Sequence, residues 1–108
     1  MAAVKKPPPG ISMDLMRSAA FEATGMLRAL ANPDRLLLLC QLSQGELSVS
    51  ELEAQVGVRQ PTLSQQLGVL RTEELVETRR DGKQIYYRIK DPKVLSLLGS
   101  LYSLYCPK

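Results

Sequence analysis

The sequence predicts a mostly α-helical protein that carries a single β-hairpin. Apolar residues recur at helical spacing in five stretches, and two strand-like runs flank Asp81-Gly82, a pair that favours a tight turn. The 108 residues, 44% of them hydrophobic, suit one globular domain with a leucine-rich core. We expect this domain to span residues 13–108 and residues 1–12, which contain three consecutive prolines, to form a flexible tail.

The stretch ANPDR separates the first two predicted helices. Apolar and small residues keep a three–four spacing over residues 13–31, which predicts the first helix. Asn32 can cap the second helix, and Pro33 at its first position needs no hydrogen-bond partner. This helix should run to about Ser43. Its leucines lie nearly all round, so we expect it to be buried on most sides.

Two shorter helices and a tight turn follow. Ser50 and Glu53 have the spacing of a capping box, which predicts a helix over residues 50–57. The fourth helix should span residues 60–72. Pro61 would then fall in its first turn, where proline is tolerated. Its inward stripe consists of Leu63, Leu67 and Leu70.

The hairpin and the last helix complete the domain. The hairpin covers LVETRRDGKQIYYRI, and Asp81-Gly82 favours a type I′ turn. The fifth helix should run from Lys93 to Tyr105 and end at Pro107. It offers more apolar surface than a small monomer should expose, which predicts a homodimer: Leu97, Leu98, Leu101 and Leu104.

The positive charge of the chain lies in one segment. Residues 59–90 hold seven cations and four anions and so account for the whole net charge of +3. A localised basic segment indicates an anionic partner, although a solvated charged face is the alternative. A helix, a tight turn and a second helix followed by a basic hairpin form the order of a winged helix-turn-helix. The second helix of that unit fits the major groove of DNA.

We therefore predict double-stranded DNA as the partner. Uncharged polar residues that can read base edges form or border the outward face of the fourth helix: Gln60, Thr62, Ser64, Gln65 and Gln66. Cations that can reach phosphates or the minor groove lie before that helix and near the hairpin tip: Arg59, Arg79, Arg80 and Lys83. An ordinary surface helix, or a winged helix that binds RNA or protein, remains the alternative.

Composition argues against an enzyme and against a metal or other cofactor. The chain has no histidine, which removes His-based catalysis and most zinc geometries. It has no glycine-rich phosphate loop and no nucleophile–base set. We find no apolar run of membrane-spanning length and no signal-peptide pattern at the start. These features predict a cytoplasmic protein without membrane contact, in which Cys40 and Cys106 are reduced thiols.

Two motifs carry a family resemblance. ALANPDRLLLLCQL resembles the junction of the first two helices in ArsR/SmtB-family bacterial repressors, and VRQPTLSQQLGVLRTEELVETRRDGKQIYYRI resembles their recognition helix and wing. The resemblance covers residues 25–106. It implies a homodimer joined through the first and last helices, which binds an inverted-repeat operator and releases it when an inducer arrives. Two positions depart from the pattern: Arg59, where serine often caps the helix, and Gly68, where a basic residue is common.

The same resemblance bears on the inducer. The arsenic-sensing motif of the family is E-L-C-V-C-D-L, whereas this chain has ELSVSEL, with the poor soft-metal ligands Ser48 and Ser50 in place of both thiolates. A cysteine in the second helix, another ending the last helix, and the stretch QPTLSQQLGVLR match the sulfide-responsive branch, the BigR and SqrR type. This implies that persulfide or polysulfide, the sulfane-sulfur inducers, link Cys40 and Cys106 through a disulfide or longer sulfur chain.

Other interpretations of the two cysteines stay open. Two thiols alone could hold a soft metal such as Cu(I) or Hg(II) on the same fold. In a DNA-architectural or anti-silencing protein the cysteines would be incidental, since free cysteine often acts as a small buried hydrophobe. If they do react, burial should disfavour a thiolate at Cys40, and the negative end of the last helix should disfavour one at Cys106. We expect the more accessible Cys106 to attack first.

Overall fold

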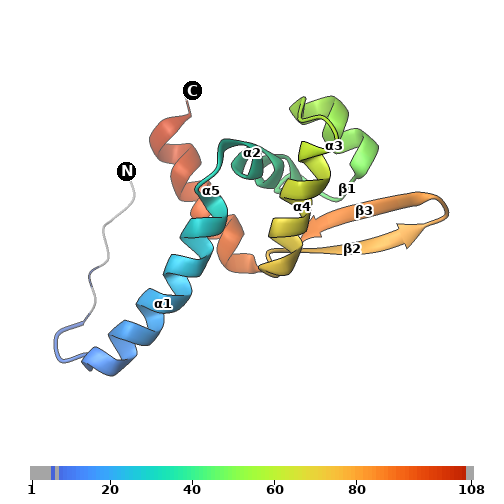
Figure 1. The fold of residues 1–108 in the computed structure, drawn as a ribbon. Helices are drawn as coiled ribbons and strands as arrows, with labels where there is room; N and C mark the ends of the chain where they lie inside the picture. The colour runs from blue at the N-terminus through green and yellow to red at the C-terminus, as the bar shows by residue number, and fades with distance from the viewer. Residues whose placement is uncertain (1–5, 7, 107–108) are drawn as a thin grey trace.

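The computed structural model describes residue 6 and residues 8–106, and it contains five helices and a three-stranded antiparallel sheet (Figure 1). Most of the predicted tail (residues 1–5 and 7) and the expected helix stop Pro107 lie outside the described residues, while residues 8–12 contain no helix or strand. The elements are α1 (Met13–Leu30), α2 (Pro33–Leu42), β1 (Leu47–Ser48), α3 (Val49–Val56), α4 (Thr62–Thr72), β2 (Val76–Asp81), β3 (Gln84–Ile89) and α5 (Pro92–Tyr105). The predicted helices and the hairpin are thus confirmed.

Buried leucines from all five helices form one core, and α2 contacts α1, α3 and α4. The side chains with almost no exposed surface are Leu38, Leu39, Leu52, Leu63, Leu67, Leu70 and Val94. The expectation that α2 is buried on most sides is wrong, because Leu37 is 51% exposed and Cys40 is also exposed. Leu38, Leu39 and Leu42 are buried in the core, and Leu36 packs against it partly buried.

The cap of α3 is a correction to the sequence prediction. Ser48 caps this helix, two residues before the predicted Ser50: its Oγ accepts from the Glu51 N–H at 3.2 Å, and the Glu51 carboxylate accepts from the Ser48 N–H at 2.9 Å. The stretch SVSELE contains the serine-x-x-glutamate spacing twice, so spacing alone could not decide between them. Ser48 also ends β1, which places it at the point where the chain turns into the helix.

The sheet has the strand order β1-β3-β2 and includes a strand that the sequence did not predict. β1 has two residues, too few for a periodic signal, and pairs with β3 through Leu47↔Tyr87. In the hairpin Asp81 pairs with Gln84, so the loop residues are Gly82 and Lys83 rather than the predicted Asp81-Gly82. Of the loop residues only Gly82 has a positive φ, 62°, which fits a type II′ turn and corrects the predicted type I′.

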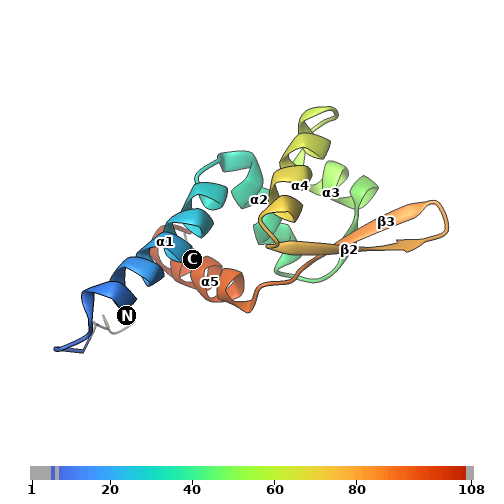
Figure 2. The same ribbon diagram turned by 60° about the horizontal axis from the view of Figure 1, so that its bottom comes forward.

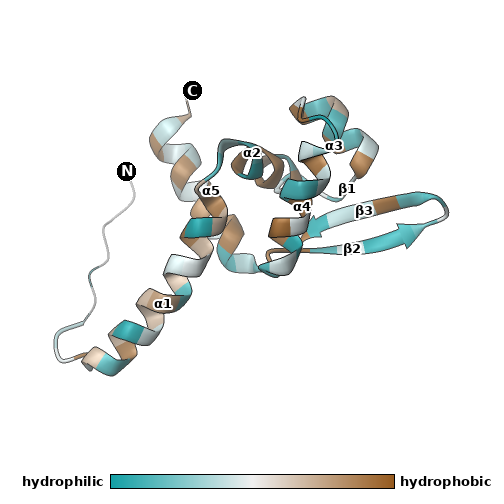
Figure 3. Cartoon of the chain, viewed as in Figure 1, coloured by the Kyte–Doolittle hydropathy of each residue, from teal (hydrophilic) through white to brown (hydrophobic). Residues whose placement is uncertain are grey.

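Helices α1 and α5 leave large apolar faces uncovered. Of the 18 residues of α1 only Ala29 and Leu30 are buried, and of α5 only Val94 and Leu98. α1 extends away from the rest of the chain on the side opposite the wing, in both views (Figures 1 and 2). The radius of gyration is accordingly 15.9 Å, against about 13 Å for a compact domain of this size. Apolar bands are visible along both helices in Figure 3, although no helix in the described part is long and apolar enough to cross a membrane.

Candidate nucleic-acid interface and thiol pair

The helix-turn-helix consists of α3 and α4, joined through Gly57 and the buried Val58. Gly57 ends α3 in the left-handed conformation, at φ 78°, and so allows the sharp turn. α4 begins at Thr62, later than the predicted residue 60, because Pro61 occupies the N-cap position. Gln60, which was predicted to begin this helix, therefore lies before it.

Two of these residues bind each other. The Gln60 Oε1 accepts from the Ser64 N–H at 3.1 Å and from the Ser64 hydroxyl at 2.6 Å. This contact replaces the capping bond that neither Pro61 nor Arg59 provides with its side chain. Gln60 and Ser64 thus stabilise the start of the helix, and both remain exposed.

The outward face of α4 leaves Gln65 available. Gln65 is exposed, and within the described residues its side chain makes no hydrogen bond to the protein. Thr62, one turn earlier on the same face, is half-buried. Gln66 is also half-buried, and its Oε1 accepts from the Arg35 Nη1 at 2.9 Å. Of the two glutamines on α4, Gln65 is therefore the one whose side-chain amide is exposed and available to a ligand.

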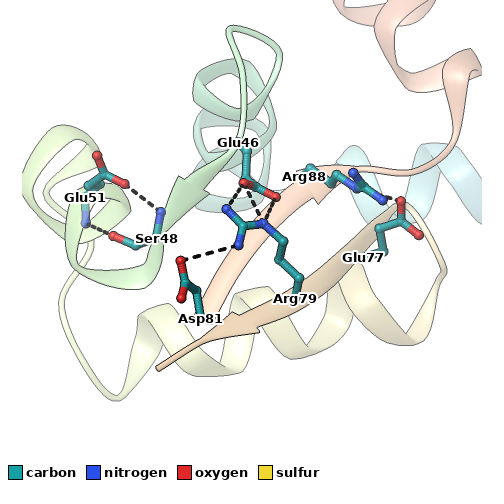
Figure 4. Close-up of polar contacts among 7 residues, drawn as sticks. All are labelled: Glu46, Ser48, Glu51, Glu77, Arg79, Asp81 and Arg88. Atoms are coloured by element: carbon teal, nitrogen blue, oxygen red, sulfur yellow. Dashed lines mark hydrogen bonds and ion pairs between the residues drawn. The ribbon is translucent and has the colours of Figure 1, made fainter. Parts of the chain in front are cut away.

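Arg79 is occupied by contacts with Glu46, which precedes β1, and with two residues of the wing (Figure 4). Its guanidinium donates from Nε to both Glu46 oxygens at 2.9 Å, with Nη2 2.7 Å from Oε1, and Nη1 lies 3.8 Å from Asp81. The same group lies 4.5 Å from the centre of the Tyr86 ring. The Arg79 hydrogen bonds lower the pKa of Glu46, and Glu46 raises the pKa of Arg79. Arg79 joins the wing to the segment that precedes β1.

Other cations of the basic segment are divided between paired and unpaired groups. Arg88 binds Glu77 at 2.8 Å and Lys90 binds Glu74 at 3.0 Å, which raises the pKa of Lys90. Within residues 8–106, no ion pair involves the remaining cations of the segment, all exposed: Arg59, Arg71, Arg80 and Lys83. Arg71, in the last turn of α4, was not among the predicted contacts, although its charge was part of the signal that predicted DNA.

The two cysteines are exposed thiols that lie far apart in the sequence. Cys40 lies on α2, and Cys106 is the C-cap of α5, where its N–H donates to the Tyr102 carbonyl at 3.0 Å. Partial burial raises the pKa of Cys40, and so does the negative charge of the Cys106 thiolate. Of these two causes, burial is the larger. Among the described residues no three acidic, cysteine or histidine side chains are grouped to hold a metal ion.

Comparison with known proteins agrees with this geometry. The family model described as bacterial regulatory protein, arsR family, matches residues 32–78. The biofilm growth-associated repressor of Agrobacterium fabrum is 51% identical over 96 residues, which is 89% of this chain and 82% of that protein. The crystal structure of the transcriptional repressor BigR from Xylella fastidiosa matches with a TM-score of 0.84 and 48% identity, covering 91% of this chain and 100% of that one.

A further solved structure is a homodimeric winged helix-turn-helix DNA-binding domain, Mb0332 from Mycobacterium bovis. It matches with a TM-score of 0.73 and 33% identity, covering 90% of this chain and 89% of that one. The residues matched by the family model include the helix-turn-helix and part of β2. The chain therefore belongs to the bacterial ArsR family of regulatory proteins and is a DNA-binding transcriptional repressor with the winged helix-turn-helix fold.

Proposed function

We propose that this repressor acts as a homodimer on an inverted-repeat operator and releases it when sulfane sulfur oxidises Cys40 and Cys106. The observation that carries the proposal is the pair of exposed thiols, one on α2 and one at the end of α5, of which one raises the pKa of the other. α2, which carries Cys40, contacts α1, α3 and α4, and Cys106 ends α5, one of the two helices that would form the dimer.

Uncovered apolar surface on α1 and α5 supports the homodimer. The two helices border a wide, open groove. Its apolar lining consists of Ala19, Ala23, Met26, Leu27, Leu75 and Leu97, and charged residues lie among them: Glu22, Glu73, Asp91 and Lys93. Isolated proteins of this size rarely expose such a continuous apolar surface. A second copy would cover it with the same helices, as a two-fold interface requires. The Mycobacterium bovis structure of the same fold is described as homodimeric.

In the proposed complex α4 enters the major groove and the wing lies against the backbone. The exposed Gln65 amide can pair with an adenine edge, and Thr62 on the same face can contact neighbouring bases. The unpaired cations Arg59, Arg71, Arg80 and Lys83 would bind phosphates. Two copies of α4 would read successive half-sites, and their spacing must match about 34–36 Å or a multiple of it.

The proposed switch is thiol exchange with sulfane sulfur. The Cys106 thiolate attacks the terminal sulfur of a persulfide R–S–SH, which forms a Cys106 persulfide and breaks the bond to the leaving R–S⁻. The Cys40 thiolate then attacks Sγ of Cys106, closes the disulfide and expels HS⁻. Two thiols are oxidised, one sulfane sulfur is reduced to sulfide, and the two thiol protons end on R–SH and sulfide. If both cysteines are first persulfidated, the bridge keeps one additional sulfur atom and one sulfide leaves.

The proposed order of attack follows from the environment of Cys40. The raised pKa of Cys40 keeps it protonated at neutral pH, which suits the resolving position rather than the first attack. A bridge between α2 and the end of α5 would alter how the helix-turn-helix is oriented on the dimer helices. Because both half-sites must be engaged together, a small rotation would weaken several contacts at once.

Operator release by different reagents tests the proposal. Labelled operator bound to the reduced protein is treated in parallel with polysulfide, hydrogen peroxide, Cu(I) and arsenite. We expect polysulfide to release the DNA and a reductant to restore binding. Release by Cu(I) or arsenite, but not by polysulfide, would assign the thiols to a soft metal instead. No release by any reagent would leave the cysteines incidental.

The two neighbouring wing arginines should behave differently. Arg80→Ala should weaken binding to all DNA sequences and lower the slope of log K against log salt by about 1 for each phosphate that Arg80 neutralises on each protomer. The double variant Glu46→Gln/Arg79→Gln removes an already neutralised pair and should leave the slope nearly unchanged. Titrations at several salt concentrations measure both. A change of base preference in Arg80→Ala without a change of slope would contradict the assignment.

The titration of Cys40 should depend on Cys106. In the wild type, initial rates of Cys40 alkylation by iodoacetamide should reach half-maximum at a pH above that of an ordinary thiol, because burial and the Cys106 charge raise the Cys40 pKa. In Cys106→Ser the midpoint should fall, because one of these two causes is gone, but burial should keep it above the ordinary value. Peptide mass spectrometry gives the rates. Identical midpoints in both proteins would mean that the thiols lie too far apart to interact.

A further inference from the structure

Arg35 connects three helices through its guanidinium. It lies in the first turn of α2, where its own N–H donates to the capping Asn32 side chain at 3.1 Å. Its Nε donates to the Ala29 carbonyl at 2.6 Å and its Nη2 to the Arg28 carbonyl at 3.1 Å, both at the end of α1. Its Nη1 donates to the Gln66 Oε1 on α4 at 2.9 Å. Figure 1 shows α2 between the end of α1 and α4, the place from which one side chain can reach both.

The chemistry of these contacts requires an arginine. Arg35 is half-buried, and within the described residues no carboxylate forms an ion pair with it. Its charge is instead compensated by carbonyls of the last turn of α1, where unsatisfied C=O groups and the helix dipole favour a cation. A lysine in the same position would keep the charge, but it lacks the planar fork that donates toward α1 and α4 together.

The Gln66 contact supplies a constraint that the core does not. The inward residues Leu63, Leu67 and Leu70 fix how deeply α4 is buried, but apolar packing has little directional preference. A hydrogen bond is directional, so the Arg35–Gln66 bond limits rotation of α4 about its own axis. Gln66 follows directly after Gln65, the exposed residue on the DNA-facing side. A small rotation at Gln66 would therefore turn the Gln65 amide away from its base.

We propose that Arg35 is a positioning residue for DNA recognition, which holds the recognition helix α4 in a fixed orientation relative to the end of α1. Gln66 then acts as the α4 anchor of this contact rather than as a reader of bases. Because α1 carries the apolar face assigned to the dimer, Arg35 links the dimer geometry to the angle of the reading helix. The inference rests on the proposed reading of DNA by α4.

A double-mutant cycle tests the contact. Arg35→Lys and Gln66→Met each remove it, and each should lower operator affinity by about 3- to 30-fold. The double variant should bind no more weakly than the weaker single variant, because both changes break the same bond. Affinity for non-specific DNA and the salt slope should stay close to wild type, since neither side chain is assigned to a phosphate. Arg17→Lys, the same substitution at an exposed position on α1, serves as the matched control.

Several outcomes would overturn the inference. Additive losses in the double variant, or a loss in Gln66→Met alone that is confined to one base position, would make Gln66 a direct DNA contact. A fall in thermal stability with unchanged affinity for operator over non-specific DNA would make Arg35 merely structural. If Arg35→Lys does not fold, the half-buried Gln66→Met variant still gives the ratio of the two affinities. Gln65→Ala separates the two proposals: if it does not weaken operator binding, reading by α4 itself is wrong.

Discussion

Polysulfide should release the wild-type repressor from its operator, whereas the Cys40→Ser and Cys106→Ser variants should remain bound under the same treatment. Neither serine can form the sulfur bridge, and each substitution removes a single thiol from an exposed position, so the fold and the basal affinity should persist. We expect a loss of response that is complete rather than graded, because either thiol alone can be persulfidated but cannot close the bridge. Fluorescence anisotropy of labelled operator, with and without polysulfide, measures it.

Mass spectrometry of the treated wild type provides the structural readout. We expect a link between Cys40 and Cys106 within one chain, with no extra sulfur or with additional sulfur atoms, and its removal by reductant should restore DNA binding. The serine variants should carry at most a persulfide on the remaining thiol. Release of both variants by polysulfide would exclude the bridge as the switch. A sulfur bridge between two chains would support the proposed thiol oxidation, but it would contradict the proposed link between α2 and α5 within one protomer.

A charge in the groove between α1 and α5 should abolish tight operator binding. Ala23 is exposed and lines this groove, so Ala23→Glu should leave the monomer folded while placing a carboxylate in the proposed dimer interface. Each monomer would then bind one half-site alone, with an affinity for the full operator lower by about 10²- to 10⁴-fold. Sedimentation velocity and operator titration report the two effects.

Two controls separate dimer loss from other causes. Ala23→Ser changes the same position without adding charge and should remain dimeric. Ala54→Glu adds the same charge at an exposed residue of α3 that does not line the groove, and should lower affinity only by its effect on the field around the DNA. A wild type that sediments as a monomer at micromolar concentration, or an Ala23→Glu protein that stays dimeric, would contradict the assignment of this face.

The parts of the fold that were predictable depend on local pattern, and the parts that were missed depend on contacts distant in sequence. Helical periodicity and turn residues predicted all five helices and the hairpin, to within a few residues. The sequence could nominate Arg79 and Gln66 as polar and exposed candidates, but it contains no sign that they bind Glu46 and Arg35. These partners lie 33 and 31 residues away. Spacing could not choose between two capping boxes, and a two-residue strand leaves no period to detect.

The ion pairs of the wing also bear on how the repressor searches the chromosome. Arg79, Arg88 and Lys90 are neutralised within the protein, which leaves four unpaired cations of the basic segment on each protomer. The proposed dimer would then offer eight from this segment, which would contribute about 7 to the slope by which log K for bulk DNA falls with log salt. A protein that holds arbitrary sequence through fewer phosphates leaves it sooner and samples more sites per unit time. Internal pairing in the wing would therefore shorten the residence on non-operator DNA, while recognition of the correct site depends on the reading helix.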